Sequence, residues 1–273
     1  MRLSRHTHTG QPSVSPARRS AKATLSAMLI GSSVLFAAAP VAVAAAPVGL
    51  DFNPHTATAQ LHSGAASHVK FATSSNWAGY AAHSTKYTSV TSTWVEPGAT
   101  CGSGTSYAAF WTGLDGYASN SVEQDGTLVQ CSGGVAQQFA WYEMYPAAPV
   151  YFNNTLSKGD TIVSRVTSTS TGAFTLYLAD TTKGWSHTVN QTNSLLARSS
   201  AEVIAEAPSS STGVLPLANF GTVTFNSCDV NGGTLAASGP TAITMVTSTG
   251  ATKVSVSAIS SSGTSFSATW HHS

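Results

Sequence analysis

Apolar and polar residues alternate with a period of two in several short stretches of this chain, and this pattern restricts the possible folds most strongly. Phe174, Leu176 and Leu178 alternate with Thr175 and Tyr177, and similar runs cover residues 222–225, 253–257 and 266–270. Such a period places one face of a β-strand on a core and the other in solvent. Glycine-containing turns separate the runs, at Lys158–Asp160, Lys183–Gly184, Asn231–Gly233 and Ser262–Gly263. The sequence therefore predicts an all-β domain, either a sandwich or a barrel.

One segment conflicts with this pattern. Residues 195–207 contain strong helix formers, so propensity alone favours a helix there. Strands are predicted throughout the surrounding sequence, and we expect a strand in this segment too. The chain has no internal repeat and no sign of a second domain, so we assign residues 74–273 to one β-domain.

The first 46 residues have the features of a secretory signal peptide. Five of the 12 Lys and Arg residues precede position 23, an apolar run from Ala23 to Phe36 follows, and small residues at 41–46 provide two A-x-A cleavage sites. A membrane anchor is the alternative, but the Ala- and Pro-rich end favours cleavage. We therefore predict that the protein is secreted and extracellular. Arg18–Arg19 could also be a twin-arginine export signal, so the export route stays open.

Residues 47–73 are predicted to be a propeptide, with a disordered extension as the alternative. They carry His55, His62, His68 and Lys70, and Asp51 is their only acidic residue. The domain that follows has ten acidic and six basic residues. We expect the basic propeptide to dock on these carboxylates near neutral pH. Acid should weaken this contact, and the precursor should then cut itself between residues 65 and 75.

Charge and cysteine content limit the possible functions. Only 8% of residues are charged and 42% are hydrophobic, which is unlike a disordered chain and allows a substantial core. No basic patch suggests a nucleic acid partner. Cys101 and Cys131 lie in Gly- and Ser-rich turn sequences, so we pair them and expect Cys228 to be a free thiol. The absence of a CxxC motif argues against a zinc site.

Several common catalytic motifs are missing from the sequence. It contains no GxSxG, no HExxH, no P-loop, and neither the DTG nor the DSG of pepsin-like aspartic peptidases. What it does contain is a series of aromatic residues beside carboxylates. These clusters are SSNWAGY at 74–80, STWVEP at 92–97, FWTGLDG at 110–116, VEQDG at 122–126, AWYEMYP at 140–146 and AEVIAEAP at 201–208. Together they are typical of a groove that holds a polymer.

The order and spacing of these clusters resemble the glutamic peptidase family, the eqolisins, from about Ser75 to Val230. The resemblance implies an antiparallel β-sandwich of two large sheets, of the concanavalin-like or jelly-roll type. It also implies that Gln124 and Glu206, rather than Glu202, are the catalytic pair. The chain departs from the family pattern beside these positions, with Asp125 after the Gln, Met144 for a tryptophan, Val203 for an aromatic residue and Ala207–Pro208 for Asp-Phe. These departures affect substrate preference more than chemistry.

The chemistry fits these residue types. A carboxylate can accept a proton from water as the water attacks a peptide carbonyl, and can return it to the leaving amine. An unperturbed Glu has a pKa of about 4.3, so such a base works in acid. The Gln amide can donate to the developing oxyanion, and no metal or other cofactor is needed. We expect Trp77, Trp111, Asp115, Glu143 and Tyr145 to bind substrate. Core packing for the tryptophans, a turn for Asp115 and a structural role for Glu143 remain alternatives.

The partners we expect are protein or peptide substrates and the protein's own propeptide, with a monomeric mature enzyme bound to neither membrane nor nucleic acid. Two other functions remain open. A carbohydrate-binding or glycan-hydrolysing sandwich would explain the aromatic residues, and it would need two carboxylates facing each other about 5–9 Å apart with Gln124 remote. A surface adhesin would have no cleft converging on Glu206.

Overall fold

The computed structural model describes residues 45–52, 57–58, 70–117, 119–169, 171–193 and 197–273. Most of the predicted signal peptide and most of the predicted propeptide, including its three histidines, lie outside these ranges. In the described part of the chain the only helix is the short 3-10 turn η1 (Ala236–Ser238). No helix there is long and apolar enough to cross a membrane.

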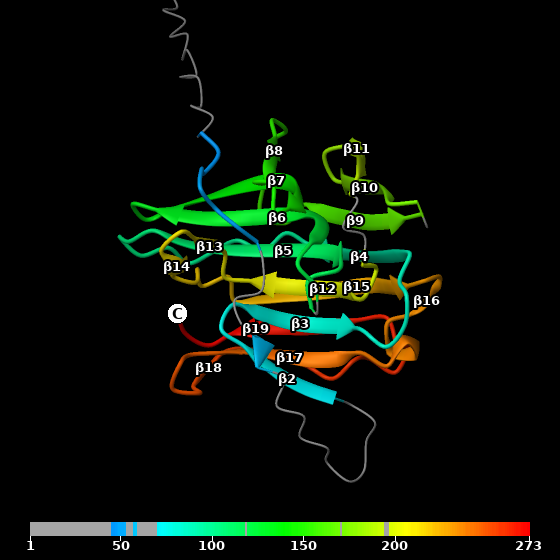
Figure 1. Cartoon of the computed structure of the whole chain (residues 1–273). Coiled ribbons are helices and arrows are strands. Elements are labelled where there is room, and N and C mark those ends of the chain that lie inside the picture. Colours follow the sequence, from blue (N-terminus) through cyan, green and yellow to red (C-terminus); the bar gives the residue numbers. More distant parts are fainter. Residues whose placement is uncertain (1–44, 53–56, 59–69, 118, 170, 194–196) are drawn as a thin grey trace, which may run out of the picture. The chain divides into compact units, whose positions relative to one another are not determined.

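The strands form two layers of a sandwich, which we call the front sheet and the back sheet (Figure 1). Neighbours within the front sheet are antiparallel, apart from the parallel pair β17–β2. In order, the front sheet runs β8 (Val150–Phe152), β7 (Val135–Tyr145), β6 (Val122–Ser132), β5 (Ser106–Leu114), β12 (Ala201–Glu206), β3 (Trp77–Ala82), β17 (Thr241–Val246), β2 (Lys70–Ser74) and β1 (Ala57–Thr58). Because β2 begins at Lys70, strand pairing extends a few residues before the predicted domain start at Ser74.

The back sheet is entirely antiparallel. Its order is β11 (Trp185–Thr192), β10 (Ala173–Asp180), β9 (Thr161–Ser168), β4 (Ser89–Val95), β15 (Thr222–Val230), β19 (Phe266–Trp270) and β18 (Thr252–Val256). Pairing of β18 with β17 joins the two sheets at one edge. The small strands β13 (Ser209–Ser210), β14 (Gly213–Val214) and β16 (Gly233–Thr234) form hairpins at the ends of longer strands. The predicted all-β sandwich is therefore confirmed.

Two hydrophobic clusters explain the burial of the front sheet. The larger lies between the sheets and includes Phe110 and Val203 of the front sheet with Trp94 and Phe225 of the back sheet. The smaller covers the outer face of the front sheet, where Leu50 and Phe52 pack over its members Trp77, Ala109, Trp111, Leu128, Phe139, Trp141 and Ile204. Strands such as β12 are consequently buried at every position, because both of their faces are covered.

Several sequence-based expectations can be compared with this fold. Residues 201–206 form the strand β12, so context overrode helix propensity as we expected. In β10 the alternation is as predicted, with Phe174, Leu176 and Leu178 buried. In β18 it is broken, because Lys253 is as buried as a core residue. The disulfide Cys101–Cys131 is present, and Cys228 is a buried free thiol whose pKa burial raises to about 12.

Candidate active site

Strand register places the predicted site residues on one face of the front sheet. Glu206 lies opposite Trp77 of β3, while Gln124 lies opposite Glu143 of β7. Trp111 of β5 lies between them in the sheet, opposite Ile204 of β12 and Gly126 of β6. Alternate residues of a strand point to the same side of the sheet. The side chains of the predicted site residues therefore all face outward from the sandwich; these are Trp77, Trp111, Gln124, Glu143 and Glu206.

The Glu206 carboxyl group is held at both of its oxygens. The indole Nε1 of Trp111 donates to Oε2 at 2.7 Å, and the amide Nδ2 of Asn76 donates to Oε1 at 3.1 Å. The ring of Trp77 packs edge-on against Trp111, with centroids 5.0 Å apart. These contacts fix the orientation of a carboxyl group that is only 1% exposed.

Burial is the main influence on the protonation of Glu206. It raises the pKa of this group well above the usual value, the hydrogen bond from Trp111 opposes that effect, and the nearby Glu143 carboxyl adds to it. The structure therefore differs from our expectation of a glutamate with an ordinary pKa. The reason is that the outer face is covered, whereas the sequence pattern alone suggested an open groove.

Gln124 and Glu143 form a directly bonded pair. The amide Nε2 of Gln124 donates to Oε2 of Glu143 at 2.7 Å, and it also donates to the main-chain oxygen of Phe52 at 2.6 Å. The amide oxygen of Gln124 is buried without a hydrogen-bond partner among the described residues. Burial raises the pKa of Glu143 to about 8, and a nearby Asp51 contributes to this rise. Gln124 is thus close to Glu143, whereas the glycosidase alternative required Gln124 to be remote from the facing carboxylates.

Comparison with known proteins identifies the family. The sequence matches the profile of the peptidase A4 family over residues 75–269, which is most of the chain. The chain belongs to the peptidase A4 family. It is 31% identical over 184 residues to aspergillopepsin-2 from Aspergillus niger, an alignment that covers 59% of this chain and 65% of that protein.

Solved structures place this A4 family member among the glutamic peptidases. Its fold matches scytalido-glutamic peptidase, solved with a transition state analog inhibitor, with a TM-score of 0.64 and 27% identity. It also matches SCP-B, a member of the eqolisin family solved with the tripeptide Ala-Ile-His, with a TM-score of 0.60 and 26% identity. Each match covers 72% of this chain and 98% of the other. The predicted resemblance to glutamic peptidases is confirmed.

Asp115, Glu123 and Glu202 form a second group of neighbouring carboxylates in this A4 fold. Asp115 accepts hydrogen bonds from the main-chain nitrogens of Arg198 and Ser199 at 2.8 and 2.6 Å, so it anchors a loop. This arrangement fits the turn alternative better than substrate binding. Asp115 also raises the pKa values of its neighbours Glu123 and Glu202, on both of which burial acts more strongly.

Tyr145 lies at the end of β7, beside the candidate site of this A4 family member. It is partly buried against the outer cluster, and the nearby Asp51 and Glu143 raise its pKa after burial does. The predicted site residues did not include Asn76 and Trp141, two residues that contact the site. Both lie in clusters identified from the sequence, Asn76 in SSNWAGY and Trp141 in AWYEMYP, so membership of these clusters was the only sequence signal for them.

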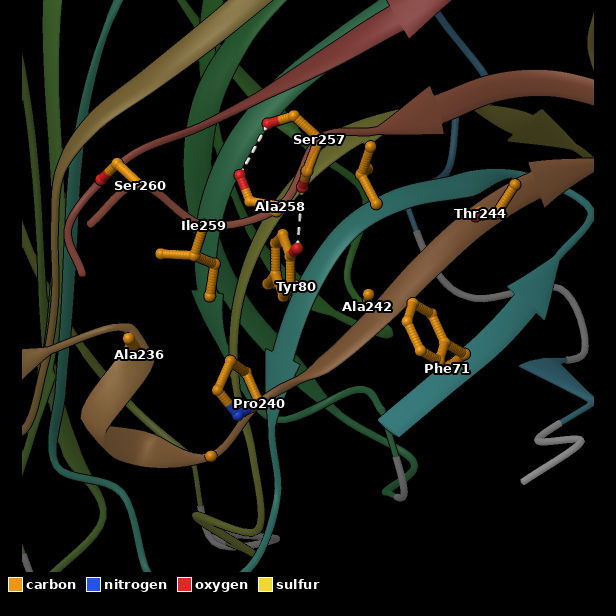
Figure 2. Close-up of a pocket in the computed structure, with 12 residues that line it drawn as sticks. Phe71, Tyr80, Ala236, Pro240, Ala242, Thr244, Ser257, Ala258, Ile259 and Ser260 are labelled. Carbon is orange, nitrogen blue, oxygen red and sulfur yellow. Dashed lines mark hydrogen bonds between the residues drawn. The ribbon is translucent and has the colours of Figure 1, made fainter. Parts of the chain in front are cut away.

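A separate pocket of about 630 Å³ has different chemistry (Figure 2). Its lining is mainly apolar and includes Phe71, Pro240, Ala242, Val256 and Ile259, with Tyr80 donating to the main-chain oxygen of Ser257 at 2.8 Å. The lining residues that the structure describes include no carboxylate and no side-chain amide. Gln124, Glu143 and Glu206 lie instead on the outer face of the front sheet.

Proposed function

We propose that this protein is a secreted endopeptidase, active in acid, in which Glu206 activates water and Gln124 stabilises the oxyanion. One observation carries the proposal. The Gln124 amide donates to a peptide carbonyl, that of Phe52, on the same sheet face to which Glu206 is oriented by Trp111 and Asn76. A donor aimed at a peptide carbonyl beside a carboxyl group is the arrangement that peptide hydrolysis needs.

The proposed reaction uses only the chain's own groups. Ionised Glu206 takes a proton from water, and the resulting hydroxide attacks the carbonyl carbon of the substrate. The oxyanion that forms accepts a hydrogen bond from the Gln124 amide, a contribution typically of about 3–4 kcal/mol. Glu206 then gives its proton to the leaving nitrogen, the C–N bond breaks, and the carboxylate is restored.

The pKa of Glu206 sets the acid side of the pH profile. A carboxyl group must lose its proton before it can act as a base, so a raised pKa makes it a stronger base but reduces the ionised fraction in acid. Substrate entry requires removal of Phe52 and Leu50, which would readmit water and lower this pKa. We therefore expect acid activity from the open cleft.

The test compares two glutamates on the same strand. The protein is incubated with a denatured protein substrate at acid and at neutral pH, beside Glu206→Gln and the control Glu202→Gln. Glu202 is buried on β12 four residues from Glu206, a separation of about 13 Å on a strand. We expect acid cleavage by the parent protein, none by Glu206→Gln, and most of the parent activity in Glu202→Gln. Equal losses in the two variants would contradict the assignment.

Secretion, cleavage of residues 1–46 and processing of residues 47–73 are part of the same proposal. They are supported by the sequence features of the amino-terminal region, since its charges and apolar run are those of an export signal. N-terminal sequencing of the protein recovered from culture medium would test them. A protein that stays with the cells and keeps its amino terminus would contradict this part.

A further inference from the structure

The chain's own residues Leu50–Phe52 occupy the proposed cleft. Leu50 is 6% exposed and Phe52 is fully buried, and both belong to the outer cluster with Trp77, Trp111 and Trp141. In Figure 1 the blue trace of this segment descends across the front of β6 and β5. Two residues earlier, Val48 is 93% exposed. Among residues 45–52, near-complete burial is thus confined to Leu50 and Phe52.

The segment is bound through its main chain by one antiparallel β-bridge to Ser209. The Asp51 nitrogen donates to the Ser209 oxygen at 2.9 Å, and the Ser209 nitrogen donates back to the Asp51 oxygen at 2.8 Å, in antiparallel orientation. Ser209 follows closely after Glu206 in the chain. This is the general manner in which extended peptides are recognised by a sheet, with main-chain bonds for affinity and pockets for alternate side chains.

The Phe52 side chain and carbonyl make the contacts expected of a substrate residue. Its ring stacks on Trp141, with centroids 3.9 Å apart and planes inclined by 12°. Its main-chain oxygen receives the 2.6 Å hydrogen bond from Gln124. Glu143 is in contact with the Phe52 backbone as well as with Gln124. One residue therefore fills an aromatic subsite and presents its carbonyl to the proposed oxyanion donor.

We propose that Leu50–Phe52 is a built-in inhibitor that binds in the manner of a substrate, with Phe52 as its anchor. This inference rests on the proposed function, because it identifies the occupied face as the substrate cleft. A tethered segment has an effective concentration on the order of millimolar, so even a segment of modest affinity competes with free substrate. Lys70, which we predicted to help hold the propeptide, lies elsewhere in the front sheet, in β2 opposite Thr241.

A binding experiment tests the occupancy without relying on catalysis. The full chain carrying Glu206→Gln is prepared with a second change, either Phe52→Ala or the control Val48→Ala, and titrated with a labelled synthetic peptide of residues 47–52. Buried aromatic anchors dominate such interfaces, so we expect the Phe52→Ala protein to bind the peptide at least about tenfold more tightly than the control. Asp51→Pro, which removes the hydrogen bond to Ser209, should have the same effect. Equal binding by all three proteins would overturn the inference.

An activity measurement separates this inference from the proposed function. In chains with Glu206 intact, Phe52→Ala should show a higher initial rate on denatured protein than Val48→Ala, and the peptide of residues 47–52 should inhibit the activated enzyme more strongly than its Phe52→Ala counterpart. Identical initial rates, with no inhibition by either peptide, would overturn the inhibitor while leaving the peptidase in place. Peptide binding as expected without activity in any variant would overturn the peptidase but leave the occupied cleft.

Discussion

At the scale of single residues, the candidate site depends on how a buried carboxyl group is held. Glu206 accepts hydrogen bonds from Asn76 and from Trp111, which lies on the neighbouring strand β5. The indole therefore has two roles, as a member of the hydrophobic cluster on the outer face and as a donor that favours the ionised form of Glu206. An aromatic residue without the N–H would keep the first role and lose the second.

Trp111→Phe should separate these two roles. Removing the Nε1 donor should raise the pKa of Glu206, because the hydrogen bond lowers it, and should shift the acid limb of kcat/KM to higher pH. Hydrogen bonds to charged groups are worth about 1.5–3 kcal/mol, so kcat should fall by about tenfold or more. A pH profile measures both effects.

The control is Trp270→Phe, since Trp270 lies in β19 of the back sheet and its Nε1 has no partner among the described residues. Its profile should match that of the parent protein. A Trp111→Phe enzyme with an unmoved acid limb would show that the indole N–H does not influence Glu206.

At the scale of secondary structure elements, the site depends on how closely β5 and β6 approach each other. Gly126 of β6 lies opposite Trp111 of β5. A Cβ atom added at Gly126 would lie 2.2 Å from the Phe110 oxygen and 2.6 Å from the Trp111 Cβ. Glycine is required here because the neighbouring strand leaves no space for a side chain.

Gly126→Ala should therefore displace β6 from β5 and disturb Gln124 and Trp111 together. Overpacking of this kind typically costs about 1–3 kcal/mol. We expect a lower free energy of unfolding in urea and a loss of activity larger than the stability change explains. Gly102→Ala is the matched control, because a Cβ there meets nothing within 4 Å. Equal stability of the two variants would contradict the close approach of the strands.

At the scale of the whole molecule, the main feature is the number of buried carboxyl groups. Burial raises the pKa values of Glu96, Glu123 and Glu143 to about 8, and those of Asp125 and Glu202 are raised in the same direction. Between the ordinary carboxyl pKa and the raised one, these groups are protonated in the folded state and ionised in the unfolded chain. Their contribution to stability is thus fully present below the ordinary carboxyl pKa and is lost as pH rises toward the folded value.

Stability should therefore be greatest in acid and should decline between about pH 4.5 and 8, by up to about 1.4 kcal/mol per pH unit for each such group. The ion pair Lys183–Asp160 has the opposite effect on the pH dependence of stability, because the pKa of Asp160 is lowered. Its stabilisation is lost only when Asp160 becomes protonated, at a pH below this range. Urea unfolding of the Glu206→Gln protein at several pH values avoids self-digestion and gives the slope. Glu96→Gln should reduce that slope, and stability that increases from acid to neutral pH would refute the prediction.

The sequence by itself determined the all-β class, the strand at residues 201–206, the Cys101–Cys131 pairing and the glutamic peptidase family. Each depends on local periodicity, on turn residues or on motif spacing, which the order of residues contains directly. The outward face shared by Gln124 and Glu206 also follows from strand alternation once the strands are known.

Only the tertiary structure decided which groups meet on that face and what covers it. Asp115 is separated from the candidate site because its carboxylate caps the backbone at Arg198 and Ser199, 83 and 84 residues further along the chain. The pKa of Glu206 is raised because distant segments bury it, and burial is a property of packing rather than of composition. For the same reason the sequence could not predict the contacts of Phe52 with Gln124 and Trp141, which lie 72 and 89 positions further along the chain. The pairing of Asp51 with Ser209 brings these distant residues together.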